Sequence, residues 1–512
     1  MLQVVWFKRD LRFTDHWPLV RAAKTGPVLA LYVFEPEMME APDYSNQHFE
    51  FIKECLICLQ TQLHLLGVQV SIEHAPMLSV LQSLKEKLGE FELLSHEETG
   101  NFLSYERDRA VTRWCLANGV VWHQFPNNGV VRRLSTRNIW SKLWVQRMSE
   151  DVFAAPAQIQ PCDPRLIRAN WPDQLSHKGP DIQRQRGGLK AAHATMKSFL
   201  AGRGAQYKRA MSSPLSAQLA CSRISPYLAF GVVSIRQVVN ELAQAREYWR
   251  GLDPALVPTG MLASITSFES RLHWHCHFIQ KLESQPSIEF ENIHRAYDGM
   301  RSEHYVADRL QAWCKGETGY PMIDACMRML ASTGWINFRM RAMLISFASY
   351  QLWLHWREPA LHLARQFLDY EPGIHYPQIQ MQSGTTGINT IRMYNPVKQA
   401  RDHDPSGEFV QRWIPALRSL PKEHLFEPWL TPPMIQIQVG CVLGRDYPMP
   451  IIDLEVSSRF ARDTVWGARK GDEFKIKALE IVEQHASRNP RREGIRRKAK
   501  APEATPQFDL FS

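Results

Sequence analysis

GETGYPMIDACMRMLASTGWINFRMRAM, residues 316–343, predicts two successive helices, over 316–330 and 333–343. Its apolar residues recur at three- and four-residue spacing, which is the period of a helix with one buried face. The second predicted helix carries Arg339 and Arg341. The same periodicity extends from about 206 to 480 with few strand-like runs. We therefore expect the C-terminal part of the chain to be an all-α domain.

Towards the N-terminus the pattern changes to alternating β-rich and helical runs. The predicted strands cover residues 3–7, 27–34, 68–74, 91–96 and 120–125, and the predicted helices cover 47–66, 77–88 and 101–118. Alternating units of this length are typical of a doubly wound parallel sheet, and the fold class is therefore α/β plus all-α. Ligands of such sheets bind at the carboxyl ends of the strands, so the loop with Lys8, Arg9, Asp10 and Arg12 is a candidate site edge.

Two further segments complete the predicted organisation. Residues 131–205 are rich in Pro and polar residues and are interpreted as a long linker with some helix between domains 1–130 and 206–480. Residues 485–512 form a basic, Pro-containing tail that we expect to be disordered in isolation.

Composition narrows the class of protein. A net charge of +9 and a pI near 9.0 point to an anionic partner, with nucleic acid the usual one and a generally basic protein the alternative. Nine scattered Cys fit a reducing compartment, and Cys55 and Cys58 are interpreted as core residues. Neither a signal peptide nor an apolar run of membrane-spanning length is evident. A cytoplasmic, monomeric protein without a membrane segment is therefore expected.

Several segments hold more polar and aromatic residues than packing requires. The run CSRISP, from Cys221 to Pro226, opens a helix with two hydroxyls and a guanidinium, an arrangement suited to phosphate but equally to a simple helix cap. LDYEPGIHY (368–376) and MYNP (393–396) follow further along the chain.

The order of these motifs closely resembles the photolyase/cryptochrome family. The motifs on which the resemblance rests are SRxSPYLAxG, GxTGYPxIDAxMRxLxxTGWxxxRxR, FLDxE and RxYNPxxQ, together with the N-terminal VVWFKRDLRFTDH. The likeness runs from residue 2 to about 465. It implies FAD, blue light and DNA, none of which follows from composition or periodicity.

The resemblance also implies a set of site residues. Those expected to contact or surround FAD are Tyr207, Cys221, Ser222, Arg223, Ile224, Ser225, Phe268, Arg271, His275, Phe338, Arg341, Asp369, Glu371 and His375. The expected catalytic residues are Trp274, which would stack on the damaged base, Trp335 beside the cofactor, His375 and Trp356. The expected DNA contacts are Arg271, Trp274, Lys398 and Arg401. An Arg341–Asp369 pair is expected near the isoalloxazine, the alternative being a salt bridge that only joins two helices.

The chain departs from the family pattern around the lesion pocket and the flavin. Arg271 stands where cyclobutane-dimer photolyases have an acidic residue, His275 replaces a common Arg, and Phe338 replaces an Asn. His375 falls at the position facing flavin N5, usually Asn. Ile379 interrupts the Trp chain of which Trp356 is the middle member.

Metals and a second chromophore are the remaining cofactor questions. The Cys set of the iron–sulfur branch is missing, and His273 and His277 share a helical face without a third ligand, so no metal is predicted. We also expect a second, antenna chromophore of folate or deazaflavin type. Glu106 matches one position that folate-binding relatives use, whereas the segment around Glu289 and Phe290 does not match them.

Light-driven repair of pyrimidine dimers by reduced FAD is the function we expect, with a cryptochrome-type photoreceptor as the alternative. The tail favours repair, because QFDLF, from Gln507 to Phe511, resembles the motif with which bacterial repair proteins dock on the DNA sliding clamp. The sequence leaves open the lesion type, the strand preference and the route of flavin photoreduction.

Overall fold

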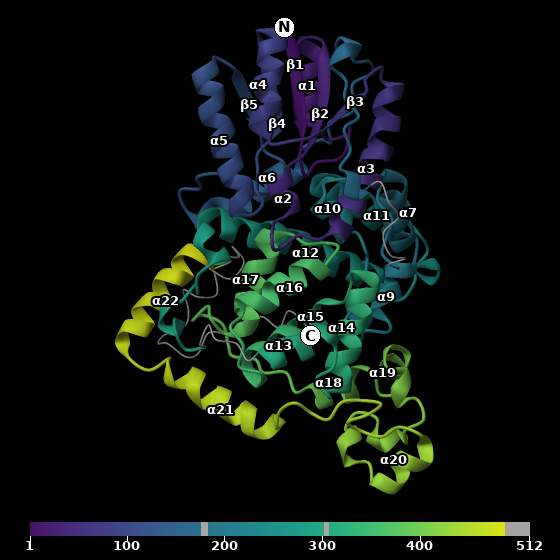
Figure 1. Cartoon of the computed structure of the whole chain (residues 1–512). Coiled ribbons are helices and arrows are strands. Elements are labelled where there is room, and N and C mark those ends of the chain that lie inside the picture. The colour runs from purple at the N-terminus through teal and green to yellow at the C-terminus, as the bar shows by residue number, and fades with distance from the viewer. Residues whose placement is uncertain (176–182, 302–306, 487–512) are drawn as a thin grey trace, which may run out of the picture.

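The structure is a computed structural model that describes residues 1–175, 183–301 and 307–486. The clamp-like motif and nearly all of the basic tail lie outside the described residues. The N-terminal sheet domain lies at the top of Figure 1, and the helical domain lies beneath it. Within the described residues, we find no helix with the length and hydropathy that crossing a membrane would need.

The N-terminal domain holds a five-stranded parallel sheet in the order β3-β2-β1-β4-β5. Its strands are β1 (Leu2–Phe7), β2 (Val28–Phe34), β3 (Val70–His74), β4 (Phe91–His96) and β5 (Val121–Phe125). Each bound lies within two residues of the prediction. In register, Val4 of β1 pairs with Leu29 on one side and Leu93 on the other. The predicted doubly wound sheet is confirmed.

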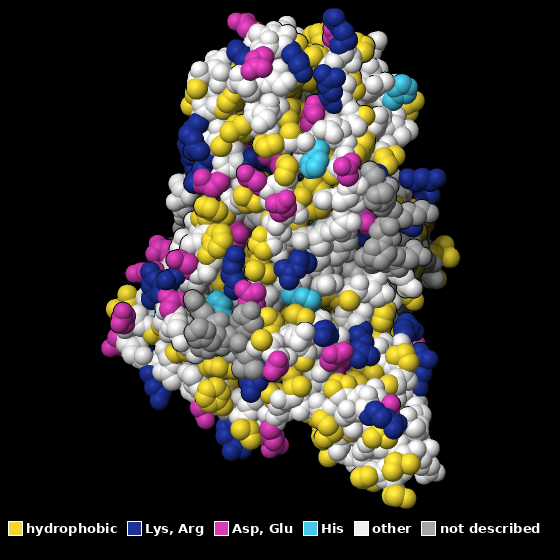
Figure 2. Space-filling view, viewed as in Figure 1, with side chains coloured by type: hydrophobic (Ala, Val, Ile, Leu, Met, Phe, Trp, Pro, Cys, Tyr) yellow, Lys and Arg dark blue, Asp and Glu magenta, His cyan; other side chains and the backbone are white. Residues whose placement is uncertain are grey.

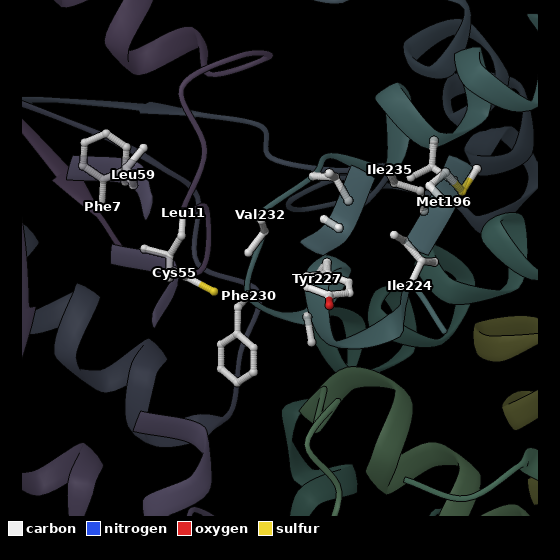
Figure 3. Packing of buried hydrophobic residues seen from close by; sticks show 14 of the residues in the cluster. Phe7, Leu11, Cys55, Leu59, Met196, Ile224, Tyr227, Phe230, Val232 and Ile235 are labelled. Atoms are coloured by element: carbon white, nitrogen blue, oxygen red, sulfur yellow. The ribbon is translucent and has the colours of Figure 1, made fainter. Parts of the chain in front are cut away.

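Alternation along the strands divides the sheet into two apolar faces. Val4 and Trp6 belong to the core beneath α4 (Met77–Leu88) and α5 (Phe102–Asn118). Val5 and Phe7 belong to the core with α1 (Trp17–Thr25) and α3 (Asn46–Leu65). This second core continues into the helical domain through Phe230 and its neighbours, as Figure 3 shows.

The described residues between 131 and 205 include two α-helices that connect the domains. They are α6 (Trp140–Ser149) and α7 (Leu189–Leu200). Trp140, Trp144 and Met196 are buried in the core shared by both domains. This segment therefore packs on both parts of the chain.

The described part of the C-terminal region is helical, as predicted. Its α-helices are α8 (Tyr207–Ala210), α9 (Ala217–Ala220), α10 (Ser225–Ala229), α11 (Ile235–Gly251), α12 (Met261–Ser284), α13 (Ala307–Lys315), α14 (Pro321–Thr333), α15 (Phe338–Ser346), α16 (Arg357–Gln366), α17 (Pro372–Ser383), α18 (Pro396–His403), α19 (Glu408–Trp413), α20 (Pro433–Val439), α21 (Leu454–Gly467) and α22 (Asp472–His485).

The helices α14 and α15 are those predicted from residues 316–343, and both begin later than expected. Gly316 and Gly319 have φ values of 67° and 79°, which are left-handed conformations that a helix does not contain. Pro321 then occupies the first turn, where its missing N–H costs nothing.

Helices α12 and α17 pack closely at the centre of the domain. A Cβ at Gly373 would lie 2.6 Å from Cα of Ile279, so only glycine allows this approach. This contact fixes the start of α17, and with it Glu371 and His375, against the helix that carries Trp274.

Candidate cofactor-binding site

The run from Cys221 to Ser225 forms a tight turn before the short helix α10. Arg223 adopts a left-handed conformation with φ of 62°, which is uncommon for a residue with a side chain. Its guanidinium lies over the Trp335 ring, 3.9 Å from Cζ to the ring centroid, and its Nε donates to Gln185 Oε1 at 3.1 Å. The turn therefore holds the Arg223 side chain against the residue expected beside the cofactor.

Arg341 and Asp369 form an ion pair between α15 and the segment before α17. Arg341 Nη2 lies 3.0 Å from Asp369 Oδ2, and the Asp369 side chain is 6% exposed. Burial alone would raise the pKa of Asp369, but Arg341 and the Ser225 hydroxyl hold it below its usual value. Asp369 Oδ1 is buried and has no hydrogen-bond partner. A carboxylate oxygen in this state is an acceptor left for a ligand.

The surroundings of this pair carry a surplus of positive charge. Burial, Arg341 and Arg203 all lower the pKa of Arg223, and Asp369 is the carboxylate that opposes them. Burial lowers the pKa of Arg223 to about 10. Because buried charge of one sign is costly, such a site favours an anionic ligand.

Aromatic side chains form a wall next to this charged turn. Tyr207 and Phe268 contact each other with ring centroids 5.8 Å apart. Burial raises the pKa of Tyr207 to about 12, although neighbouring Arg271 opposes the change. Burial likewise raises the pKa of Cys221 to about 12, which keeps this thiol protonated. The structure thus brings together, in one region, Tyr207, Cys221, Ser222, Arg223, Ser225, Phe268, Arg271, Trp335, Arg341 and Asp369.

These residues fit a flavin dinucleotide. The arginine surplus and the Ser222 and Ser225 hydroxyls suit phosphates, the aromatic wall suits a planar ring, and the orphaned Asp369 Oδ1 suits an N–H or O–H donor.

His375 lies on α17 close to the ion pair but is bound to the protein. Its Nε2–H donates to the Ala360 carbonyl at 2.9 Å, and its ring lies against Tyr370 at 5.2 Å. Burial lowers its pKa to about 4, so the imidazole is neutral at physiological pH. Trp356 lies in the core of the helical domain, fully buried, with its Nε1–H donating to Asn292 Oδ1 at 2.8 Å.

Trp274 of α12 and Phe338 of α15 are the residues expected at the lesion pocket. The Trp274 ring contacts His277 and Phe278, at 4.9 and 5.7 Å between centroids. Phe338 is the first residue of α15 and is half-buried.

His275 and Glu371 lie at the boundary between the two domains. With Arg9 and Arg12 they line a small cavity of about 30 Å³. Glu371 accepts from Arg9 Nη2 at 2.8 Å and from Gly373 N at 3.4 Å. Burial lowers the pKa of His275 to about 4, and Arg9 acts in the same direction. The carboxylate of Glu371 thus joins the N-terminal loop to the first turn of α17.

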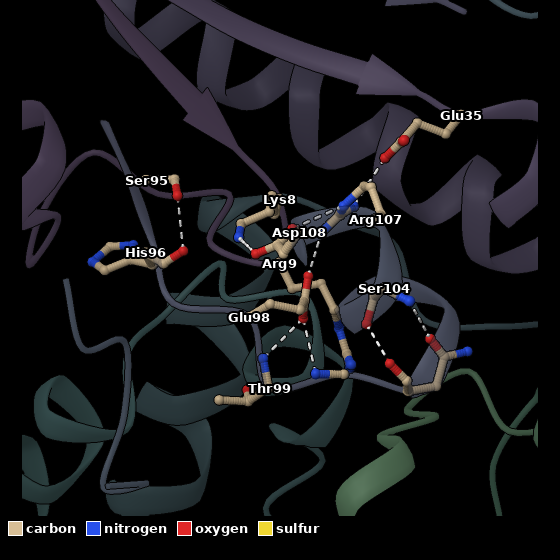
Figure 4. A network of polar contacts seen from close by, with 12 residues as sticks. Lys8, Arg9, Glu35, Ser95, His96, Glu98, Thr99, Ser104, Arg107 and Asp108 are labelled. Carbon is tan, nitrogen blue, oxygen red and sulfur yellow. Dashed lines mark hydrogen bonds and ion pairs between the residues drawn. The ribbon is translucent and has the colours of Figure 1, made fainter. Parts of the chain in front are cut away.

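The loop after β1, a predicted site edge, is engaged with protein partners throughout. Lys8 bonds Asp108 of α5 at 2.9 Å, and Arg107 bonds Glu35 at 2.9 Å and Glu98 at 2.6 Å. Figure 4 shows these ion pairs filling the region at the carboxyl ends of β1, β2 and β4. Sequence reasoning missed this network because it joins loops distant in the chain.

Asp10 is held by two histidines, His16 at the N-cap of α1 and His96 at the end of β4. Its Oδ2 accepts from His16 Nε2 at 2.9 Å and from His96 Nδ1 at 2.6 Å, and all three residues are buried. These three could reach one metal ion. However, Leu19 N–H donates to His16 Nδ1, which places the proton of the neutral ring on Nε2, pointing at Asp10. The hydrogen bonds therefore account for the cluster without an ion.

Lys398 and Arg401, the expected DNA contacts on α18, lie on the surface. Their side chains are 69% and 61% exposed and pair with Asp402 and Glu427. On the face shown in Figure 2, basic side chains are interspersed with acidic and apolar ones and do not gather into one patch.

Both parts of the chain are similar to known proteins. A family model described as DNA photolyase matches residues 3–138, and one described as the FAD binding domain of DNA photolyase matches residues 268–467. The deoxyribodipyrimidine photo-lyase of Vibrio cholerae is 27% identical over 479 residues, which cover 88% of this chain and 96% of that relative.

Solved structures show the same architecture. A cryptochrome of Synechocystis sp. PCC6803 superposes with a TM-score of 0.80 at 22% identity, covering 91% of this chain and 99% of that one. A class III photolyase from Agrobacterium tumefaciens superposes with a TM-score of 0.76 at 22% identity, covering 92% and 98%.

Proposed function

The chain belongs to the photolyase/cryptochrome family, and on that premise we propose that it repairs UV-induced pyrimidine dimers in DNA with blue light and reduced FAD. The observation that carries the proposal is the buried Arg341–Asp369 pair with its orphaned Asp369 Oδ1, beside Arg223 and Trp335. It stands within the matched FAD-binding segment, in a chain whose relatives include deoxyribodipyrimidine photo-lyases.

We assign three roles to the residues of the site: holding the phosphates of FAD, setting the charge beside its ring, and contacting the lesion. Ser222, Arg223 and Ser225 would hold the phosphates of FAD through hydroxyl and guanidinium donors. Reduced FAD held by these residues would supply the light-driven electron donation that splits the dimer, with the electron returned afterwards. Arg341 and Asp369 set the charge next to the ring.

The lesion side of the site is the task of Trp274 and Arg271. A dimer stacked in DNA cannot reach a buried cofactor and must be turned out of the helix. Trp274 offers an aromatic face to the extruded bases, and Arg271 offers positive charge to a phosphate. Lys398 and Arg401 would hold the flanking backbone, since both are on the surface.

The test is repair of oligonucleotides that carry one cyclobutane dimer or one (6-4) product, single- or double-stranded. Reduced FAD-loaded protein is illuminated with blue light, with a dark sample as control. We expect light-dependent restoration of one lesion type. Photoreduction of bound FAD without repair of either lesion in either strand form would overturn the proposal.

That negative result would favour the cryptochrome-type photoreceptor. The observation on its side is the altered pocket, in which Arg271 and Phe338 stand where dimer-repairing relatives have an acidic residue and Asn. A photoreceptor would answer blue light with a conformational change and would not split dimers.

The C-terminal tail carries a short segment suited to binding a protein partner. Residues 507–511, QFDLF, offer Leu and Phe anchors and a Gln on a polar segment, the chemistry of a short peptide that fills a hydrophobic pocket. We propose that this segment docks on the bacterial DNA sliding clamp, which would bring the enzyme to replicating DNA.

A further inference from the structure

Helix α12 carries three polar side chains at four-residue spacing, the first of them three residues after Trp274. His277, Lys281 and Gln285 follow one another at this interval, so they lie in a row along the helix and its cap. Arg137, from the turn before α6, meets the row at His277, and His485, the last residue of α22, meets it at Gln285. Lys281 lies between these two contacts.

Arg137 is buried and only partly bound. Its Nη2 lies 2.7 Å from His277 Nδ1 and donates to the His277 carbonyl at 3.3 Å, while its guanidinium lies over Trp140 at 4.8 Å. The residue is 9% exposed, and its Nη1 is buried without a hydrogen-bond partner. An unused guanidinium nitrogen at this depth is a donor lacking its acceptor.

His485, at the other end of the row, is likewise buried with one nitrogen that has no partner. Its Nε2 lies 2.6 Å from Gln285 Oε1, the residue is 2% exposed, and its Nδ1 has no partner. Lys281 has its Nζ 4.9 Å from the Phe278 ring, and no carboxylate pairs with it among the described residues.

Among the described residues, the ionisable groups that influence one another here are all basic. They are Arg137, His273, His277, Lys281 and His485. The other four each lower the pKa of His277, and Arg137 also lowers the pKa of His273, Lys281 and His485. Burial and Arg137 together lower the pKa of Lys281 to about 7. Cationic groups gathered in a protein interior are costly unless an anion compensates them.

We propose that Arg137, Lys281 and His485 form a binding site for a small oxyanion of the phosphate class. The three groups come from three elements, and Arg137 Nη1 and His485 Nδ1 are both buried donor positions without a partner. A tetrahedral oxyanion offers several acceptor oxygens to such an arrangement, whereas a planar carboxylate offers two. The depth of Arg137 and His485 excludes a nucleic-acid backbone and selects a small ion or the terminal phosphate of a small molecule.

The test uses the full chain with FAD bound, so that the flavin site is filled, and inorganic phosphate as the probe. Calorimetric titration should give one saturable site per chain, and phosphate should raise the melting temperature. Lys281→Met should weaken phosphate binding by roughly tenfold or more, the loss expected for a charge-assisted hydrogen bond. The same variant should melt higher than wild type without phosphate, because it removes a cation from a like-charged cluster.

Two further variants separate binding from folding. Lys281→Arg should keep the response to phosphate. Lys315→Met, at an exposed lysine at the end of α13, should leave both binding and melting unchanged. Each of three results would overturn the proposal: no saturable binding to wild type, an equal phosphate response in Lys281→Met, or displacement of phosphate from Lys281 by an undamaged oligonucleotide.

Discussion

Asp369 is under opposing influences that its surroundings balance. Burial disfavours its charge, whereas Arg341 at 3.0 Å and the Ser225 hydroxyl favour it. The pair matters for a flavin because a fixed charge beside the ring determines how readily the ring holds an extra electron. Arg223 and Arg203 extend the positive field towards the turn at Ser222.

Asp369→Asn tests this arrangement. The change leaves Arg341 and Arg223 without their carboxylate, so we expect weaker FAD retention and a free energy of unfolding lower by about 2 kcal/mol. Flavin absorbance after gel filtration and chemical denaturation measure the two effects. Asp402→Asn, an exposed residue paired with Lys398, is the matched control. Wild-type flavin content and redox behaviour in Asp369→Asn would contradict the assignment.

Glu289 gives a prediction about pH. It is buried, accepts from Phe102 N at 2.8 Å, and burial raises its pKa to about 7. A Glu with a raised pKa in the folded protein stabilises the fold in its protonated form. This contribution is complete below the unfolded pKa near 4.5 and is lost as the pH rises towards 7. Glu289→Gln should therefore stabilise the protein at pH 8 by on the order of 2 kcal/mol and much less at pH 5. Unfolding curves of wild type and Glu289→Gln at pH 5 and pH 8 measure this difference, with the exposed Glu291→Gln as the control. Equal effects of Glu289→Gln at the two pH values would contradict the prediction.

Individual contacts differ in how far the sequence predicts them. The Arg341–Asp369 pair follows from motif positions of a known family. Asp10 follows β1 and His96 ends β4, so the strand pattern places both at the carboxyl edge of the sheet. Predicting their contact also requires knowing that these two strands are neighbours. Arg9 with Glu371, 362 residues apart, depends on how two domains meet, which no local pattern encodes.

Elements were more predictable than contacts. The five strands are apolar runs bounded by turns, and their bounds agree with the structure within two residues. Helix α1 (Trp17–Thr25) was missed: it is short, begins directly after the RFTDH loop and holds Pro18 in its first turn. Its burial depends on the sheet beneath it, because Leu19 and Ala22 pack into the shared core.

The contact between α12 and α17 gives a prediction at the level of elements. Gly373→Ala places a methyl group 2.6 Å from Cα of Ile279, and backbone cannot move aside as a flexible side chain can. We expect a loss of about 2 kcal/mol in the free energy of unfolding. Gly251→Ala, at the end of α11 where a Cβ meets nothing within 4 Å, should be neutral. Thermal denaturation compares the two, and equal stability of both variants would contradict the packing.

At the scale of the whole molecule, the two domains share one core and are joined by ion pairs. Residues of β1, α3, α7 and α10 lie in a single apolar cluster, and Arg9 reaches Glu371, the Tyr370 carbonyl and the Ala229 carbonyl. The sheet domain is therefore a support for the helical site, which it holds in place at the start of α17.

The tail adds a prediction about partners. Deleting residues 506–512 should abolish capture of the DNA sliding clamp in a pull-down, because the proposed anchors are then lost. FAD content should not change, since the flavin site lies in the helical domain. Exchanging Leu510 and Phe511 for Ala in the full chain separates the anchors from tail length. Undiminished capture by both variants would contradict the proposed docking.

If light absorbed by bound flavin drives repair, the repair rate must depend on wavelength as flavin absorption does, and an action spectrum measures this dependence. The rate of dimer splitting is measured at a series of wavelengths with equal photon flux, and once in the dark. We expect a rate that follows the absorption of the protein's own chromophores and vanishes in the dark. Repair in the dark, or a spectrum unrelated to that absorption, would contradict it.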